Sequence, residues 1–375
     1  MAGIYLHIPY CRSKCHYCDF YATSNMTSVQ KLVESEMSEL ISRKPYIGNE
    51  IVETIYFGGG TPSVLSANQV TDLLAVIYTN FIVASDCEIT LEANPEDLEE
   101  PYLTELRLAG INRMSIGIQS FNNEMLSYLG RGHDNSRLVN KIKAVQKAGI
   151  ENISIDLIYG IPGLSLENYL ESLKEAMQLG IQHISAYSLI IEKNTFFYKL
   201  YKTNRLFEAP DDDVVAQFNA TIDTLANHGF SHYEVSSFAL EGFKSRHNSS
   251  YWEGKKYLGV GPSAHSFDGI SRQWNVSSIR NYILNMANSK DYFDIEILSE
   301  TDRYNEYLLV GLRTAKGISR NHISETFNQN ISAYFLRELS KLNSEDFISV
   351  TDDRVTLTRK GIFVSDLIIR SLFFN

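Results

Sequence analysis

Three cysteines lie within eight residues of one another near the start of the chain, in the pattern C-x3-C-x2-C. They are Cys11, Cys15 and Cys18. Three thiolates can bind three irons of a cubane cluster and leave the fourth iron open, and an open coordination position accepts a small chelating ligand. Zinc is the alternative, because His16 would complete a set of four ligands. The remaining cysteine, Cys87, is expected to be a small buried apolar residue.

A run of three glycines follows an apolar segment at 54–57 and leads into Thr61 and a proline. Glycine permits close approach of the backbone to a ligand and dihedral angles that other residues avoid. Gly59, Gly60 and Thr61 are therefore candidates for contact with a bound small molecule. A tight turn between a strand and a helix is the simpler alternative.

Polar side chains also stand in or at the ends of otherwise apolar segments. Glu92, Gln119 and Asp156 each occupy such a position, where burial is costly unless the group finds a partner. A capping or network role is one reading, and hydrogen bonding to a ligand is the other. Arg131 could pair with a ligand carboxylate.

A histidine followed by aromatic residues forms a second motif, at 246–252. Its sequence, H-N-x-x-Y-W, contains His247, Tyr251 and Trp252. Neutral histidine is a common axial ligand of heme iron, and tyrosine and tryptophan offer flat apolar faces suited to a porphyrin. A hydrogen-bonded histidine in a surface groove is the alternative.

The elements that position these residues alternate between apolar runs and amphipathic helical patterns. Strands are predicted at 4–8, 54–57, 88–92, 113–118, 153–158 and 183–189, and helices at 29–42, 68–78, 102–108, 138–148 and 166–179. Such alternation is typical of parallel βαβ units. We therefore predict an α/β fold, a partial (β/α)6 TIM-like barrel, whose catalytic face is the carboxyl end of its strands.

The pattern changes after about residue 240. We predict three regions, which are the barrel at 1–240, a connecting region with the H-N-x-x-Y-W motif at 241–290, and a smaller domain at 291–375. The smaller domain is mostly helical, with one hairpin pairing 347–350 with 354–357. Helices followed by two short strands resemble a winged-helix-like module.

Composition narrows the classes of function. The chain has 375 residues, 44% of them hydrophobic and 21% charged, which is typical of a globular protein. A net charge of −11 does not favour nucleic acid or an anionic membrane surface. No apolar run is long enough to span a bilayer, so an integral membrane protein is not expected. Four cysteines are too few for a disulfide scaffold, and we expect a cytoplasmic protein.

The cysteine pattern, with an aromatic residue before its last cysteine, resembles the signature of the radical S-adenosylmethionine (SAM) superfamily. The resemblance implies a [4Fe-4S] cluster on the three cysteines and SAM on the open iron, where reductive cleavage yields a 5′-deoxyadenosyl radical. It also implies a set of SAM-binding residues: Tyr5, Tyr17, Gly59, Gly60, Thr61, Glu92, Gln119, Arg131 and Asp156, with Tyr187 and His265 matching more loosely.

Within the superfamily, the chain resembles the group of oxygen-independent coproporphyrinogen III dehydrogenases and the related heme chaperones of the HemW type. Phe20 stands where the dehydrogenases usually carry a further cysteine. The chain begins ten residues before Cys11, and we expect it to lack the long leading segment of the dehydrogenases. The H-N-x-x-Y-W motif is associated with heme binding in the chaperone branch.

These features favour the chaperone branch. The resemblance then implies heme bound through His247, Tyr251 and Trp252, and possible delivery of heme to acceptor proteins of respiration. The alternative is an enzyme, a coproporphyrinogen III oxidase (dehydrogenase) that decarboxylates porphyrinogen propionates by radical chemistry. A different radical SAM enzyme with another substrate is a weaker reading. Whether the chain is an enzyme therefore stays open at this point, as does its oligomeric state.

Overall fold

The computed structural model describes residues 1–132, 135–342 and 346–374. Its main feature is a twelve-stranded sheet in the order β12-β11-β10-β9-β1-β2-β3-β4-β5-β6-β8-β7. The six predicted parallel strands are confirmed and lie side by side in chain order. They are β1 (Ala2–Ile8), β2 (Ile51–Gly59), β3 (Ile82–Ala93), β4 (Arg113–Gln119), β5 (Asn152–Tyr159) and β6 (His183–Ser188).

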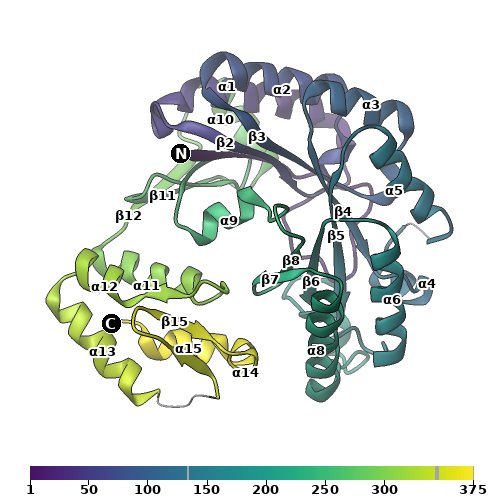
Figure 1. Ribbon diagram of the computed structural model, residues 1–375. Helices are drawn as coiled ribbons and strands as arrows, with labels where there is room; N and C mark the ends of the chain where they lie inside the picture. The colour runs from purple at the N-terminus through teal and green to yellow at the C-terminus, as the bar shows by residue number, and fades with distance from the viewer. Residues whose placement is uncertain (133–134, 343–345, 375) are drawn as a thin grey trace.

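Helices cover the outer face of this sheet, as Figure 1 shows. The five predicted helices are present, and further helices accompany them. The helices of the barrel are α1 (Val29–Ile47), α2 (Ala67–Asn80), α3 (Glu100–Ala109), α4 (Asn123–Leu129), α5 (Leu138–Lys147), α6 (Leu166–Gln178), α7 (Phe196–Lys202) and α8 (Asp211–Asn227). Local sequence sets their ends. Ser66 and Gln69 form a capping box at the start of α2, and Gly110 ends α3 in the left-handed conformation.

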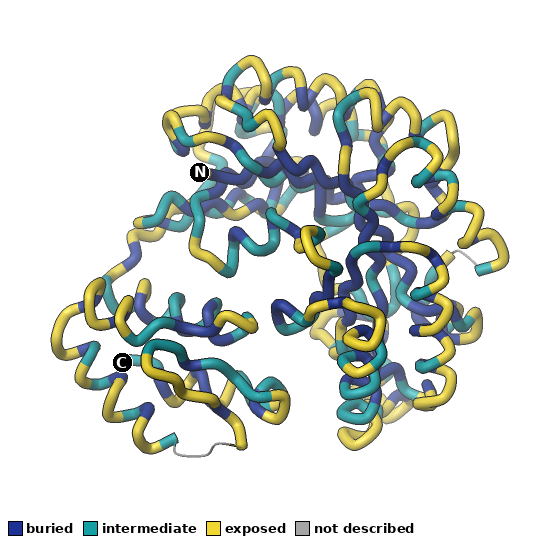
Figure 2. Tube along the Cα trace, in the orientation of Figure 1, coloured by how far each residue is buried: buried dark blue, intermediate teal, exposed yellow. Residues whose placement is uncertain are grey.

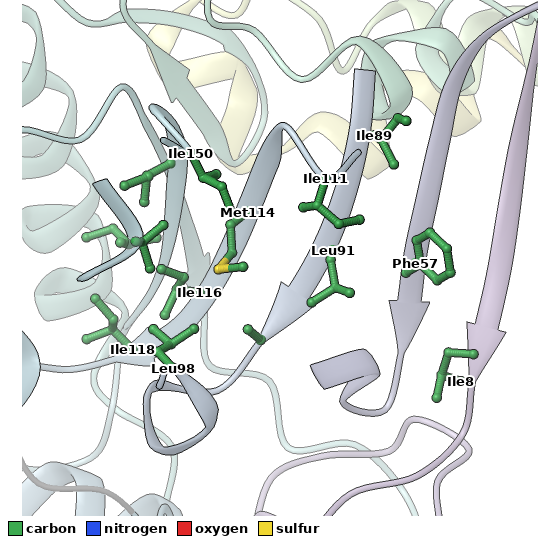
Figure 3. Packing of buried hydrophobic residues seen from close by; sticks show 14 of the residues in the cluster. Ile8, Phe57, Ile89, Leu91, Leu98, Ile111, Met114, Ile116, Ile118 and Ile150 are labelled. Carbon is green, nitrogen blue, oxygen red and sulfur yellow. The ribbon is translucent and has the colours of Figure 1, made fainter. Parts of the chain in front are cut away.

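The two faces of the parallel strands carry different side chains. On β1, Ile4, Leu6 and Ile8 are fully buried and belong to the main apolar core, whereas the intervening Tyr5 and His7 line a cavity on the inner side. Successive residues of a strand point to opposite faces. The outer face therefore carries the apolar side chains of the core, some of which Figure 3 shows on neighbouring strands, and the inner face presents polar and aromatic groups.

The region predicted to be a connector, 241–290, instead extends the sheet. β9 (Lys256–Val260) pairs with β1 in parallel, which makes a seventh parallel strand, and β10 (His265–Phe267), β11 (Ser271–Asn275) and β12 (Phe293–Ile297) continue the sheet antiparallel. At the other end, β8 (Ser237–Ala239) and β7 (Ser231–Glu234) form an antiparallel edge. The order of the sheet has two ends, so the barrel is open. α9 (Arg246–Trp252) and α10 (Ile279–Ala287) belong to the same region.

The C-terminal residues form a second domain with its own core, which includes Tyr304, Leu308 and Phe335. Its elements are α11 (Glu300–Gly311), β13 (Ile318–Ser319), α12 (Arg320–Thr326), α13 (Gln329–Lys341), β14 (Ile348–Val350), β15 (Arg354–Leu357), α14 (Arg359–Phe363) and α15 (Ser365–Leu372). The predicted hairpin is confirmed as β14 and β15, and β13 pairs with β15. Figure 2 shows this domain as a separate body with its own buried segments.

The two domains touch at a few defined points. The amide of Val235 donates to the carbonyl of Arg313 (2.9 Å), and the amide of Ala315 donates to that of Tyr233 (3.0 Å). Arg272 of β11 forms a two-pronged ion pair with Glu306 of α11 (2.5 and 2.9 Å). Arg359 of α14 pairs with both carboxylate oxygens of Asp223 on α8 (2.7 and 3.0 Å). The C-terminal domain is thus joined by the chain to the β12 edge and bonded to the β7–β8 edge and to α8. Among the described helices, none is long and apolar enough to cross a bilayer.

Candidate cofactor and ligand site

The cysteine loop follows β1 at the carboxyl end of the parallel strands. The amide of Cys11 donates to the carbonyl of Thr23 (3.0 Å), and the amide of His16 donates to that of Leu129 (3.0 Å). The His16 ring also bonds the Tyr128 carbonyl through Nδ1 (2.9 Å) and packs against Phe196. His16, which a zinc site would need as its fourth ligand, therefore serves to hold the loop against α4 and α7.

The three thiols are partly exposed, and two of them receive hydrogen bonds. Thr61 donates to Sγ of Cys11 (3.3 Å), and Arg131 donates to Sγ of Cys15 (3.4 Å). Such donors favour the thiolate form that binds metal. Across residues 1–132, 135–342 and 346–374, no group of three or more His, Cys, Asp or Glu side chains is arranged to hold a metal ion. A cubane spreads its thiolates over three irons, so a cluster need not gather the sulfurs around one point.

The glycine run brings the end of β2 against the start of the cysteine loop. The amide of Thr61 donates to the carbonyl of Tyr10 (2.7 Å), and a Cβ at Gly60 would lie 2.6 Å from that same carbonyl oxygen. Gly59 has a positive φ of 115°. A side chain at Gly60 would force the two loops apart, and one at Gly59 would meet the ring of His7, which explains why the sequence has glycine at both positions.

Arg131 links the cysteine loop to the ends of β3 and β4. Its Nη2 donates to Oδ1 of Asn94 (2.7 Å) and to the carbonyl of Gly117 (2.6 Å). Asn94 in turn donates to Thr61 (3.3 Å), so it bridges the two residues that bond the thiols. Sequence analysis did not select Asn94, although its place two residues after Glu92 was a usable signal. Gln119 ends β4 with a positive φ of 70°, which is a strained conformation for a non-glycine residue.

Two carboxyl groups face the inner side of the barrel. Glu92 accepts from the Tyr56 hydroxyl (2.7 Å) and from the amide of Gly59 (3.2 Å), and burial raises its pKa to about 7. Asp156 accepts from Ser115 (3.4 Å), and burial raises its pKa to about 6. The negative charge of Asp156 also raises the pKa of Glu92, and a cationic ligand would relieve this repulsion.

The other predicted SAM residues lie in four different segments of the chain. Tyr17 is in the cysteine loop, where burial holds the pKa of its hydroxyl well above its usual range. Tyr5 bonds Nδ1 of His7 through its hydroxyl (3.0 Å). Tyr187 ends β6 and is 45% exposed, and His265 begins β10 with its ring near Trp274. Of these four residues, Tyr187 lies near the carboxyl end of a parallel strand and Tyr17 in the cysteine loop, whereas Tyr5 lies within β1 and His265 on β10.

A cavity of about 1310 Å³ lies between the strand ends and the C-terminal domain. Tyr5, Gly59 and Glu92 contribute from the barrel, and Tyr251 and Trp252 contribute from α9. The opposite wall consists of residues of α11, of α12 and of the β13 and β15 strands, among them Tyr307, His322 and Arg354. Figure 1 shows α9 facing the C-terminal domain across this region.

His247 of the same motif points away from the cavity. It is fully buried, its Nδ1 bonds Thr54 (2.8 Å), and its Nε2 bonds the Tyr251 hydroxyl (2.8 Å). The ring stacks on Tyr56 at 4.9 Å, and burial lowers its pKa to about 3, so the imidazole is neutral. Both ring nitrogens already have partners, and the residue fixes α9 against β2.

Glu88 completes this attachment. Its carboxylate accepts from the amides of Arg246 and His247 (3.1 Å each) at the start of α9, where unpaired backbone N–H groups favour an anion. Glu88, Thr54 and Tyr56 were not selected from the sequence. Their alternation with apolar residues along β2 and β3 was the available signal, because it marks the inner face of the sheet.

Comparison with known proteins agrees with this geometry. Residues 5–176 match the Radical SAM superfamily, and residues 298–364 match the HemN C-terminal domain. The heme chaperone HemW of Bacillus subtilis (strain 168) is 33% identical over 96% of both chains. The heme chaperone HemW of Escherichia coli (strain K12) is 37% identical over 70% of this chain and 69% of that one.

A solved structure has the same fold along almost the whole chain. It is that of coproporphyrinogen III oxidase (HemN) from Escherichia coli, described as a radical SAM enzyme. The TM-score is 0.85 with 22% identity, over 99% of this chain and 90% of that chain. Together, the cysteine pattern, the barrel, the C-terminal domain and the full-length similarity show that this chain belongs to the HemW family of the radical SAM superfamily.

Proposed function

We propose that this protein is a heme chaperone that binds heme in the cavity between its two domains and transfers it to acceptor proteins. The observation that carries the proposal is the cavity itself. Its volume of about 1310 Å³ exceeds the roughly 300–1,000 Å³ of ordinary small-molecule pockets. Tyr251 and Trp252 line it and offer flat faces to a macrocycle.

We propose further that Cys11, Cys15 and Cys18 hold a [4Fe-4S] cluster and that SAM binds its open iron. The hydrogen bonds from Thr61 and Arg131 to two of the thiols suit thiolate ligands. Glu92 and Asp156, whose pKa values burial raises to about 7 and about 6, suit the positive charges of SAM. When bound, the cluster and SAM together would supply reductive cleavage of SAM. The residues named here would hold the cluster and SAM next to the cavity.

In this proposal, Tyr251 and Trp252 contact heme directly, and His247 holds Tyr251 in place. Ligation of iron by His247 itself would require α9 to leave β2, with loss of both imidazole hydrogen bonds. The relatives are named heme chaperones, a role that implies acceptor proteins, and respiratory proteins are the class of acceptor that we propose.

Radical decarboxylation of coproporphyrinogen III is the second candidate function. The HemN-like fold favours it, and the same cavity would admit a porphyrinogen. Phe20 counts against it, because it occupies the position of the further cysteine and its exposed ring lines the cavity.

The test is anaerobic reconstitution with iron and sulfide, followed by titration with heme and absorbance spectroscopy. A brown cluster band together with a saturable Soret band would support the chaperone. A cluster band with no heme uptake would contradict it. In that case, protoporphyrinogen formation from coproporphyrinogen III and SAM would establish the enzyme instead.

A further inference from the structure

His322 is an accessible histidine on the C-terminal wall of the cavity. It lies on α12, its side chain is exposed, and it lines the cavity. Its ring packs on Tyr307 with centroids 4.6 Å apart, and Nδ1 bonds the Thr326 hydroxyl (3.3 Å). In the tautomer whose Nδ1–H donates to this hydroxyl, Nε2 presents a free lone pair, which is the usual arrangement of a metal-binding imidazole.

The other histidines near the cavity are less suited to bind a metal there. His247 is buried, and both of its nitrogens are occupied. His7 bonds Tyr5 through Nδ1, and its Nε2 is shielded from solvent without a partner. His265 is exposed, but among the described residues no hydrogen bond orients its ring, which only neighbours Trp274. His322 combines access with an orienting hydrogen bond.

The same wall carries cations that lack a salt bridge. Arg303 and Lys316 line the cavity and are exposed, and neither forms a salt bridge to any residue that the structure describes, although hydrogen bonds and the charge of Arg303 lower the pKa of Glu300. Arg354 has only a distant partner in Asp353 (3.6 Å). Arg272, by contrast, is held by both oxygens of Glu306. Cations that lack a salt bridge, beside an accessible imidazole, suit a flat ligand that has a metal centre and carboxylates at its edge, which is the chemistry of heme with its propionates.

We propose that His322 binds the heme iron through Nε2 and that Arg303 and Lys316 pair with the heme propionates. The inference rests on the proposed function, because it assigns the residues that hold heme in the same cavity. The C-terminal domain then supplies the metal ligand and the charge, and α9 of the barrel supplies the aromatic face. No bond of the heme is broken in this step, which is ligation and ion pairing alone.

The test compares His322→Ala with the unchanged protein and with His228→Ala, in heme titrations of the cluster-loaded full chain. His228 is also exposed, but it lies at the end of α8 and outside the cavity lining. We expect His322→Ala to weaken heme binding by roughly tenfold or more and to shift the Soret band, with the cluster absorbance unchanged. Free imidazole in the buffer should restore the original spectrum, which a merely structural role would not allow.

The outcomes separate this inference from the proposed function. If the unchanged protein takes up no heme, the proposed function fails. If it takes up heme and His322→Ala gives the same affinity and the same Soret band, the assignment of His322 is overturned and the function stands.

A second titration tests the propionate contacts with heme dimethyl ester, which lacks the two charges. The unchanged protein should prefer heme to the ester, and the double variant Arg303→Ala/Lys316→Ala should lose most of that preference. Retention of the full preference in the double variant would overturn the assignment of these two residues.

Discussion

The two walls of the cavity each carry a histidine on a seven-residue helix, α9 on one side and α12 on the other, and the two side chains are built in opposite ways. His247 is fully buried, stacked on Tyr56 and bonded at both nitrogens. His322 is exposed and bonded at one nitrogen. The first arrangement stabilises the protein, and the second leaves a nitrogen available to a ligand. Hydrogen-bond partners therefore say more about a histidine than the motif in which it stands.

Replacement of Cys15 should have the largest effect of the substitutions considered. It should abolish cluster binding at the barrel wall and leave heme binding at the C-terminal wall nearly unchanged. Cys15→Ala leaves two thiolates, which cannot hold three irons, so we expect complete loss of the cluster absorbance after reconstitution. Heme binding should change by no more than about threefold if the C-terminal wall supplies the iron ligand. Joint loss of both signals would show that the walls depend on each other. Cys87→Ala, at a buried cysteine outside the loop, is the matched control for the cluster.

His247→Ala should destabilise the protein strongly, because it leaves the Thr54 and Tyr251 hydroxyls without their partner and removes a stacked ring. We expect a loss of about 2–4 kcal/mol in the free energy of unfolding, measured by anaerobic denaturant titration. His322→Ala removes an exposed side chain and should stay within about 0.5 kcal/mol. Similar losses for both variants would show that the two histidines do not differ in their contribution to stability.

Glu92 gives the stability of the barrel wall a dependence on pH. Burial raises its pKa to about 7, so its contribution to stability is present below about pH 4.5 and is lost as the pH rises through about 7. We expect Glu92→Gln to remove this loss. As the pH is raised from 5 to 8, the free energy of unfolding of the variant should increase by about 1–3 kcal/mol relative to that of the unchanged protein. Denaturant unfolding curves of both proteins at pH 5 and at pH 8 measure this change. A difference between the two proteins that is the same at both pH values would contradict the prediction.

The ion pair that joins the two walls, Arg272 with Glu306, should contribute least to the free energy of unfolding. Arg272 and Glu306 are each nearly 30% exposed, and their two-pronged contact crosses from β11 to α11. We expect Arg272→Gln to cost about 1 kcal/mol at low salt and less at high salt, in thermal unfolding. A loss that is unchanged in 1 M salt would mean that packing of the side chain, and not its charge, joins the walls.

Local signals made the barrel and the cysteine loop predictable. The strand at 4–8, the cysteines after it and the glycines after 54–57 are each encoded within a few residues, and parallel strands bring their carboxyl ends together without further information. β9 could not be predicted in this way, because its five residues carry a weak pattern and its partner β1 lies about 250 residues away in the chain.

The orientation of His247 was also beyond sequence reasoning. A motif of seven residues specifies which side chains share a short helix, but not which face of that helix packs against the sheet. Thr54, Glu88 and Tyr56 decide that orientation, and they come from distant strands. Asn94 is similar, because its role depends on the meeting of Thr61 and Arg131, which only the folded chain brings together.

The open sheet has a mechanical consequence. The C-terminal domain continues from β12 at one edge, and at the other edge it meets the β7–β8 turn through the amides of Val235 and Ala315. It therefore spans the gap that a closed barrel would not have. On that side Arg359 of α14 also pairs with both carboxylate oxygens of Asp223 on α8, and Phe363 packs against Phe218. The cavity is thus bounded on one side by a domain whose bonds to the barrel named here involve neither the parallel strands nor the cysteine loop.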